Sequence, residues 1–220
     1  MIPLDEYTTK VMKRLYGRYS NQLTTALDHV NMTELFVAVL LSPQSNDNQT
    51  NRVTERLFTK YKTFEDYANA DLNALRKDMS GMNYYKTKAK HLRLAARMIL
   101  DRFGGEVPRT LAELMELPGV GRKVANVVQN EGYNLDEGIA VDTHAARTSR
   151  RLRLSRRKDP VKIEQDLMRR IDKTWWRNSS NLLIALGRDT CKARKKECYR
   201  CVLRDICPSS EASAGKEKGI

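Results

Sequence analysis

The chain has 220 residues, and its 40 Lys and Arg against 27 Asp and Glu give a formal net charge of +13 at pH 7. This length allows one large or two small domains with a substantial core. The excess of positive charge favours a polyanionic partner, nucleic acid above all, although a merely basic surface would give the same count. The first ten residues lack the basic-then-apolar pattern of a secretory signal, and the longest apolar run, residues 35–41, is too short to span a membrane. We therefore expect a soluble, intracellular protein.

The apolar pattern is helical from the first clear element onward. Asn31-Met-Thr-Glu34 has the spacing of a capping box and opens onto LFVAVLLS, which we interpret as a buried helix. The same run could be a strand, but no partner run with a period of two occurs in the sequence. Val53, Leu57 and Tyr61 then recur at a spacing of four, which is typical of one face of a helix.

Further helices are predicted downstream. One extends over residues 86–103, with an apolar stripe along one face, and ends at Gly104-Gly105. Its stripe consists of Ala89, Leu92, Ala96, Ile99 and Phe103. Thr110 and Glu113 cap LAELMEL, RKVANVVQN follows, and two later helices cover residues 163–171 and 181–186. Because no strand is expected, the predicted fold class is all-α. Residues 211–220 have the composition of a disordered tail.

The sequence LPGVGRK predicts a tight hairpin between two helices. Pro118 ends the first helix, and the two glycines leave the backbone unobstructed. Backbone N–H groups beside a helix N-terminus can bind an anion, and a DNA phosphate could approach closely here. The alternative is an ordinary tight helical corner. The candidate DNA contacts of the hairpin are Gly119, Val120, Gly121 and Arg122.

Lys123 is the second residue of the helix that follows the hairpin. It lies at the positive end of the helix dipole and at the edge of the apolar face formed by Val124, Val127 and Val128. Both effects disfavour the ammonium form and predict a lowered pKa. A neutral amine can attack an electrophilic carbon and form a Schiff base. The alternative is a phosphate-binding lysine, and this stretch alone does not separate the two.

Asp142 follows the apolar segment Ile139-Ala-Val and precedes a predicted helix. It can cap that helix, and it can also supply a fixed carboxylate that stabilises positive charge and assists proton transfer. Both roles can hold together. His144 is a polar residue at the helix start and a candidate DNA contact, and a metal-ligand role is not favoured because no second histidine is near.

Four cysteines fall within one short segment with the spacing C-x6-C-x2-C-x5-C, followed by Pro208. Zinc is the generic alternative, but zinc ribbons usually pair two short knuckles and this segment has one. The spacing and the terminal Cys-Pro favour a cubane iron–sulfur cluster. The predicted ligands are Cys191, Cys198, Cys201 and Cys207. The loop between the first two is basic, and its candidate DNA contacts are Lys192, Arg194 and Lys195.

The stretch RTSRRLRLSRRK, residues 147–158, holds seven basic residues. It could be a solvated helix face, or it could add phosphate contacts, and in the second case DNA affinity would fall steeply with salt.

LPGVGRK, then VDTH, then the cysteine spacing together resemble the pattern of endonuclease III, a family of iron–sulfur DNA glycosylases with a helix-hairpin-helix. The resemblance extends from LLSPQSND to Cys207. It implies a 4Fe–4S cluster and two helical domains with a DNA-binding cleft between them. The expected domains are residues 1–25 with 137–210, which hold the cluster, and residues 26–136, which hold six helices and the hairpin.

The resemblance also implies base excision repair of oxidised pyrimidines. The lysine matching Lys123 attacks C1′ of the sugar, the base leaves, and β-elimination through a Schiff base nicks the strand, assisted by the aspartate matching Asp142. Gln44 matches the glutamine that fills the gap left by the flipped base. Asp47 would lie near the pocket, and Met82 matches the second wedge position. The second wedge loop looks longer than usual and resembles that of the adenine-mismatch branch, which mostly lacks the lysine.

The expected partner is double-stranded DNA with damaged bases or abasic sites, bound by a monomer without membrane association. For a prokaryotic source we expect a cytoplasmic, nucleoid-associated enzyme. Two alternative functions remain at this point. One is a mismatch glycosylase acting on uracil or thymine, and the other is a non-catalytic DNA-binding module with a structural cluster, which the joint presence of Lys123 and Asp142 disfavours.

Overall fold

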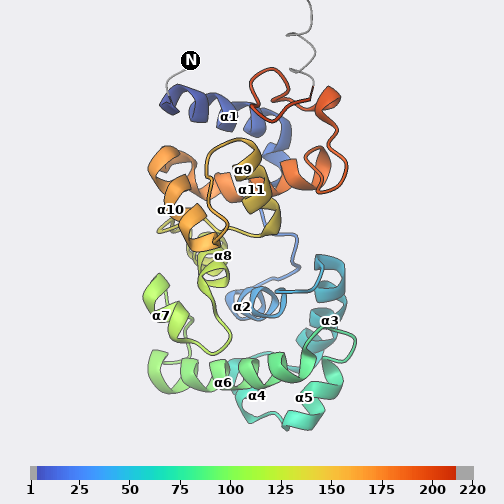
Figure 1. The fold of residues 1–220 in the computed structure, drawn as a ribbon. Helices are drawn as coiled ribbons and strands as arrows, with labels where there is room; N and C mark the ends of the chain where they lie inside the picture. Colours follow the sequence, from blue (N-terminus) through green and yellow to red (C-terminus); the bar gives the residue numbers. More distant parts are fainter. Residues whose placement is uncertain (1–3, 212–220) are drawn as a thin grey trace, which may run out of the picture. The chain divides into compact units, whose positions relative to one another are not determined.

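The computed structural model describes residues 4–211 of the chain. Within this range every regular element is a helix, and the β pairing is confined to an isolated bridge between Cys191 and Lys196 (Figure 1). The all-α prediction is confirmed. No helix in this range is long and apolar enough to cross a membrane. The predicted tail lies, apart from Glu211, outside the described residues.

The chain forms two compact units, one continuous and one built from both ends of the chain. The central unit is Ala26–Leu135, and the terminal unit combines Met1–Thr25 with Asp136–Ile220. The helices of the central unit are α2 (Met32–Leu41), α3 (Asp47–Lys60), α4 (Phe64–Asn69), α5 (Leu72–Asp78), α6 (Tyr85–Phe103), α7 (Leu111–Glu116) and α8 (Arg122–Tyr133). The terminal unit contains α1 (Leu4–Tyr19), α9 (Thr143–Arg151), α10 (Pro160–Arg170) and α11 (Trp176–Asp189), with short 3-10 turns at Ser20–Gln22, Lys173–Trp175 and Cys198–Arg200.

The core of the central unit surrounds α2, whose residues from Leu35 to Leu41 are all buried. Helix α2 packs on α3, α6 and α8, while α6 also packs on α4 and α5. The Asn31 side chain caps α2 by accepting the Glu34 N–H at 2.9 Å. Glu34 in return accepts the N–H of Val30, one residue earlier than a standard capping box predicts. A helix buried this completely fixes the positions of the loops at both of its ends.

Helix α6 is the longest helix of the central unit and runs across it in Figure 1. The predicted stripe is correct: Ala89, Leu92, Ala96 and Ile99 are fully buried. The helix ends where Gly104 adopts a left-handed φ of +62°. At the start of α7, Thr110 and Glu113 form the complete capping box that the sequence predicts.

The terminal unit has its own core, in which α11 contacts both α1 and α9. Val11, Met12 and Leu15 of α1 are fully buried there, as are Leu182 and Leu183 of α11. Residues that are far apart in sequence therefore complete one hydrophobic core.

Replacing Leu92 by Ala should lower the free energy of unfolding by about 2–5 kcal/mol, because the deletion leaves a cavity in a fully buried site. Leu135→Ala, at a residue with 42% exposure in the same unit, is the matched control and should cost less than about 1 kcal/mol. Urea unfolding followed by circular dichroism measures both. Equal losses in the two variants would contradict the assigned core.

Candidate functional site

The hairpin between α7 and α8 is a tight turn of four residues. The N–H of Val120 donates to the carbonyl of Leu117 at 3.0 Å, with Pro118 and Gly119 at the two central positions. Proline followed by a residue of positive φ is the signature of a type II turn, and Gly119 has a φ of +85°. The Pro118-Gly119 pair therefore predicts this turn from the sequence.

The two hairpin glycines differ in how strictly the fold requires them. A Cβ on Gly119 would lie 2.9 Å from Nδ1 of His91, so the turn packs directly against the ring from α6. Gly121 has an ordinary φ of −90°, and a Cβ there would meet nothing within 4 Å. Gly119 is needed by the fold, whereas Gly121 leaves open space beside the start of α8.

Val120 does not fit the predicted role in DNA contact. Its N–H is engaged inside the turn, and its side chain is 6% exposed in the core of the central unit. The remaining hairpin candidates are Gly119, Gly121 and Arg122. Gly121 is the N-cap of α8 and makes no side-chain hydrogen bond to the first turn. At the start of α8 the hairpin therefore presents backbone groups to a ligand, and no side chain caps them.

Lys123 lies in the first turn of α8 and is half-buried. Its neighbours Val124 and Val128 are in the core, and Val127 packs against it from the edge. The predicted position at the margin of the apolar face is therefore correct. The amine lies near the positive end of the helix dipole, where an ammonium is disfavoured.

Asp142, in the terminal unit, is the N-cap of α9. Its Oδ1 accepts the N–H of Ala145 at 2.7 Å, which fixes the carboxylate at the helix start. The second oxygen makes no hydrogen bond to any residue between 4 and 211 and can act on another group. His144 is half-buried, with Nδ1 at 3.1 Å from Arg147 Nη2.

Two loops of the central unit meet beside the starts of α3 and α6. Gln44 and Tyr84 both have left-handed backbones, with φ of 59° and 56°, a strained conformation for residues other than glycine. The loops are tied together because Asn83 Nδ2 donates to the Gln44 carbonyl at 2.7 Å and Gln49 Nε2 donates to the Gly81 carbonyl at 2.5 Å. The sequence did not reveal this strained pair.

The side chains of the two loops differ in their access to solvent. Gln44 is exposed, and Asp47, in the first turn of α3, is half-buried. Met82 is only 4% exposed and belongs to the core, which argues against its expected role as a wedge. Tyr84, two residues later, is 66% exposed.

A surface pocket connects these loops with the hairpin. It is lined by Leu40, Pro43, Gln44, Tyr84, Thr87, Lys88, His91 and Gly119. Lys88 is 9% exposed and its Nζ donates to Ser45 Oγ at 3.0 Å. Burial lowers the pKa of Lys88 to about 8. Neither Lys88 nor His91 was singled out from the sequence, because nothing local distinguishes them from the other polar residues of α6.

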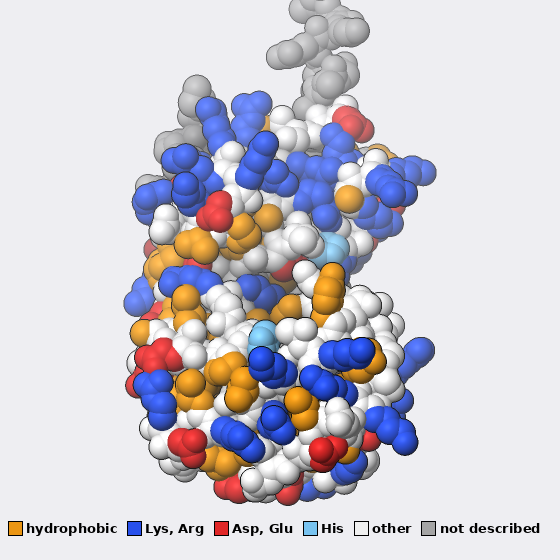
Figure 2. Space-filling model, turned by 60° about the horizontal axis from the view of Figure 1, so that its bottom comes forward, with side chains coloured by type: hydrophobic (Ala, Val, Ile, Leu, Met, Phe, Trp, Pro, Cys, Tyr) orange, Lys and Arg blue, Asp and Glu red, His pale blue; other side chains and the backbone are white. Residues whose placement is uncertain are grey.

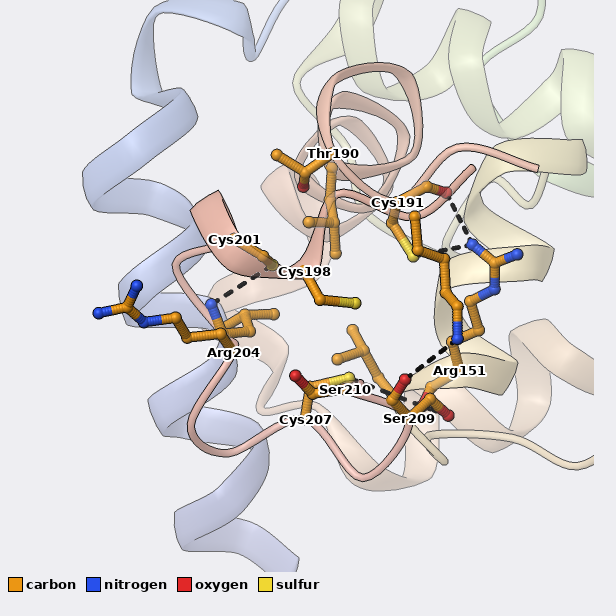
Figure 3. A pocket seen from close by; sticks show the side chains of 13 residues that line it. Arg151, Thr190, Cys191, Cys198, Cys201, Arg204, Cys207, Ser209 and Ser210 are labelled. Atoms are coloured by element: carbon orange, nitrogen blue, oxygen red, sulfur yellow. Dashed lines mark hydrogen bonds between the residues drawn. The ribbon is translucent and has the colours of Figure 1, made fainter. Parts of the chain in front are cut away.

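The four cysteines line a second pocket, within the terminal unit. Figure 3 shows their side chains around one space, with Arg151 and Arg204 on opposite sides. The space not filled by atoms is about 390 Å³. No three His, Cys, Asp or Glu side chains in the described range are placed to hold one metal ion. Four cysteine thiols around one space are the donor set of a zinc or an iron–sulfur centre.

The charge of the cysteine pocket also points to a metal centre. Burial raises the pKa of the Cys201 and Cys207 thiols, and the neighbouring cysteines raise both further. Four thiolates in one pocket therefore require compensating positive charge. A metal centre supplies that charge and is bound by the thiolate form.

Arginines of α9 hold the loop that carries the first cysteine. Arg151 donates to the carbonyls of Lys192 and Ala193 at 2.8 and 3.0 Å, and to Cys191 Sγ at 3.2 Å. Arg147 donates to the carbonyls of Gly187 and Cys191 at 2.8 and 3.1 Å. At these two positions, the basic stretch 147–158 is neither a solvated face nor a set of free phosphate contacts.

The same loop presents charge to solvent. Lys192, Arg194 and Lys195 are all exposed, and Lys192 pairs with Glu197 at 2.8 Å. Lys and Arg side chains are dense on the face of the molecule shown in Figure 2, over both units. The excess of basic residues in the sequence is therefore exposed to solvent on this face.

Comparison with known proteins places these features in one family. Residues 37–173 match the family described as HhH-GPD superfamily base excision DNA repair protein. Endonuclease III of Bacillus subtilis is 44% identical over 195 residues, which cover 88% of each chain. The chain belongs to the endonuclease III family. Endonuclease III of a Synechocystis strain is 39% identical over 92% of this chain and 91% of its own.

Solved structures agree with this membership. A trapped endonuclease III–DNA covalent intermediate is 38% identical, with a TM-score of 0.86, and covers 91% of this chain and 94% of its own. A non-covalent endonuclease III–DNA complex has a TM-score of 0.87 at 36% identity, with 96% and 97% covered. A thermostable thymine-DNA glycosylase has a TM-score of 0.80 but is 18% identical, so that likeness concerns the fold alone.

The two hairpin glycines give a matched pair of variants. Gly119→Ala should lower the free energy of unfolding by about 1–3 kcal/mol, because alanine disfavours the positive φ and its Cβ meets His91. Gly121→Ala should cost less than about 1 kcal/mol, because its φ is ordinary and the space is open. Thermal and urea unfolding without DNA measure both losses. A Gly121 variant as unstable as the Gly119 variant would overturn the distinction.

Proposed function

We propose that this endonuclease III family member is a bifunctional DNA glycosylase and AP lyase, which removes oxidised pyrimidines from double-stranded DNA in base excision repair. The observation that carries the proposal is Lys123 in the first turn of the helix that follows the type II hairpin. Its solved relatives include one trapped as a covalent intermediate with DNA. A non-catalytic DNA-binding module does not need this amine together with a fixed carboxylate such as that of Asp142.

Lys123 is the nucleophile of the proposed reaction. Its neutral amine attacks C1′ of the damaged nucleotide, and the C1′–N bond breaks as the base leaves with one proton. The C1′–O4′ bond then breaks, which opens the sugar ring, leaves O4′ as a hydroxyl with the second proton of the amine, and gives a Schiff base between Nζ and C1′. Removal of a proton from C2′ then expels the 3′ phosphate by β-elimination, which nicks the strand. Hydrolysis of the Schiff base releases the enzyme.

Asp142 supplies the carboxylate of the reaction. The oxygen that does not cap α9 stabilises positive charge developing on the sugar and assists proton transfer. The capping bond holds the side chain in one orientation, so a single residue serves both the helix and the chemistry. We assign Asp47 to the base pocket, next to the exposed Gln44, which fills the gap left by the flipped base.

Phosphate contacts hold the duplex in place. We assign them to the backbone at Gly119, Gly121 and Arg122, to His144, and to the exposed Lys192, Arg194 and Lys195 of the cysteine loop. We further propose a monomer acting on cytoplasmic DNA, associated with the nucleoid if the source is prokaryotic. A uracil or thymine mismatch glycosylase is the second candidate, but the thymine-DNA glycosylase neighbour supports the fold alone.

Cys191, Cys198, Cys201 and Cys207 are proposed to hold a 4Fe–4S cluster. The four thiols around one pocket and the charge that they require fit such a group. When bound, the cluster supplies a rigid, charge-compensating crosslink of the loop that bears the basic residues. Arg151 donates to the same loop and orients it from the side of α9.

Borohydride reduction tests the nucleophile. Wild-type protein should form a covalent adduct with a duplex carrying an abasic site or thymine glycol, because reduction traps the Schiff base. Lys123→Gln should reduce the adduct at least about a hundredfold, since glutamine has no nucleophilic amine. Lys77→Gln, at an exposed lysine of α5, is the control and should match wild type. Gel analysis of the crosslinked DNA measures all three.

The lyase assignment would be wrong if wild type gave no adduct or if the Lys123 variant gave as much as wild type. A parallel cleavage panel with uracil and thymine mismatches distinguishes the second candidate. Excision of mismatched thymine in preference to thymine glycol would replace the oxidised-pyrimidine assignment.

Metal analysis tests the cysteine centre. Purified protein should be brown and contain about four irons and four sulfides per chain. Cys198→Ser should lose most of the visible absorbance, because one of the four ligands is removed. Colourless wild-type protein with stoichiometric zinc would refute the cluster. Elemental analysis and the visible spectrum distinguish the two outcomes.

A further inference from the structure

Lys88 is the one lysine in the described range whose side chain is buried, at 9% exposure. It lies on the second turn of α6 and lines the pocket between the Gln44 loop, α6 and the hairpin. Its exposed neighbours Lys86 and Lys90 belong to other faces of the same helix. A lysine in this position is withdrawn from bulk solvent yet open to whatever enters the pocket.

Among the described residues, no carboxylate pairs with the Lys88 ammonium. Its hydrogen-bond partner among the described residues is the hydroxyl of Ser45, at 3.0 Å, and no carboxylate lines the pocket. An ammonium has three donors, so two remain without a described acceptor. Burying a charge without a partner is costly, and the consequence here is a pKa lowered to about 8 by burial alone.

The surroundings of the pocket indicate which anion could supply the missing charge. Gly119 of the hairpin forms one wall, and its backbone packs against His91, one helical turn from Lys88. The strained residues Gln44 and Tyr84 also line the pocket. Gln44 and Gly119 line this pocket, and the proposed function places both against DNA. The anionic groups of DNA are its backbone phosphates, so a phosphate is the anion expected to reach Lys88.

We propose that this pocket is a phosphate-binding site in which Lys88 receives a backbone phosphate of the DNA as its counter-ion. The proposal rests on the proposed function to the extent that the protein binds DNA, but not on which base is removed. It assigns to Lys88 a role separate from Lys123, because Lys88 binds the backbone and takes no part in the bond changes at C1′.

Proton uptake follows from this assignment. A phosphate beside the ammonium favours the charged form, so the pKa of Lys88 is higher in the complex than its value of about 8 in the free protein. At pH 8 roughly half of the free molecules carry a neutral Lys88, and binding adds up to about half a proton per complex. Affinity is then fully developed below pH 8 and falls as the pH rises through it.

The alternative is a purely structural role. Lys88 could simply hold the Gln44 loop through Ser45, together with the bond from Asn83 to the Gln44 carbonyl. In that case the charge of Lys88 would not matter to DNA, and removal of the Ser45 hydroxyl would have the same effect as removal of the lysine. The two roles therefore predict different results for Ser45→Ala.

Binding is measured with a duplex carrying a tetrahydrofuran analogue of an abasic site, which cannot form a Schiff base. Fluorescence anisotropy between 50 and 200 mM KCl gives the salt dependence of the affinity. Lys88→Met should weaken binding about tenfold near 100 mM KCl and reduce the slope of log K against log salt by about 1. Lys88→Arg and Ser45→Ala should keep the wild-type slope. Lys90→Met, on another face of α6, is the matched control for loss of one positive charge.

Calorimetry at pH 8 in two buffers of different ionisation enthalpy gives the proton count. Wild type and Ser45→Ala should take up protons on binding, whereas Lys88→Arg and Lys88→Met should not. The other titratable groups of the pocket, Tyr84 and His91, are kept in both Lys88 variants, so an uptake that disappears belongs to Lys88. Circular dichroism of the free variants establishes that each is folded.

Three outcomes would overturn the proposal. The first is a Lys88→Met variant with the wild-type salt slope, and the second is proton uptake that persists in Lys88→Arg. The third is a Ser45→Ala variant with the same losses as Lys88→Met, which would assign Lys88 to the loop alone. Failure of the proposed function is a different result, in which wild type itself does not bind the duplex.

Discussion

The contact between the backbone of Gly119 and the ring of His91 is the constraint on which the central unit's site depends. The left-handed backbone of Gly119 makes the turn, and the absence of a Cβ lets the turn rest on α6. This contact fixes where α8 begins, and with it the position of Lys123 in the first turn. Helix α6 thus supports the hairpin with His91 and lines the adjoining pocket with Lys88.

A different constraint governs the terminal unit, where the cysteine segment has almost no regular structure of its own. Arginine side chains supply the hydrogen bonds that a helix or sheet would supply through its backbone. They can do so because one guanidinium offers five N–H donors in a fixed plane. Arg147 and Arg151 direct these donors to the consecutive loop carbonyls of Cys191, Lys192 and Ala193, and Arg147 also donates to Gly187 in α11. Basic residues in this enzyme therefore serve two purposes, internal support and surface charge, which composition alone cannot separate.

Much of this could be predicted from sequence, wherever the signal is local. The periodic apolar stripe and the caps predicted α6 within one residue at its start, and Pro-Gly predicted the hairpin. The short helices α4 and α5 were missed because each has too few residues to show a period, although Thr63 and Asp71 cap them. The burial of Lys88 and of Met82 could not be predicted from the sequence, because both depend on contacts between segments distant in sequence.

The division of the chain has a consequence for biosynthesis. The central unit is one continuous segment, so it can complete its core while the rest is still being translated. The apolar face of α1 is synthesised before the central unit, yet it packs on α11, which is synthesised after that unit. Val11, Met12 and Leu15 thus remain without their native partners while the whole central unit is synthesised. The apolar face of α1 stays exposed on the nascent chain until α11 is made, and chaperone binding during translation should concentrate there.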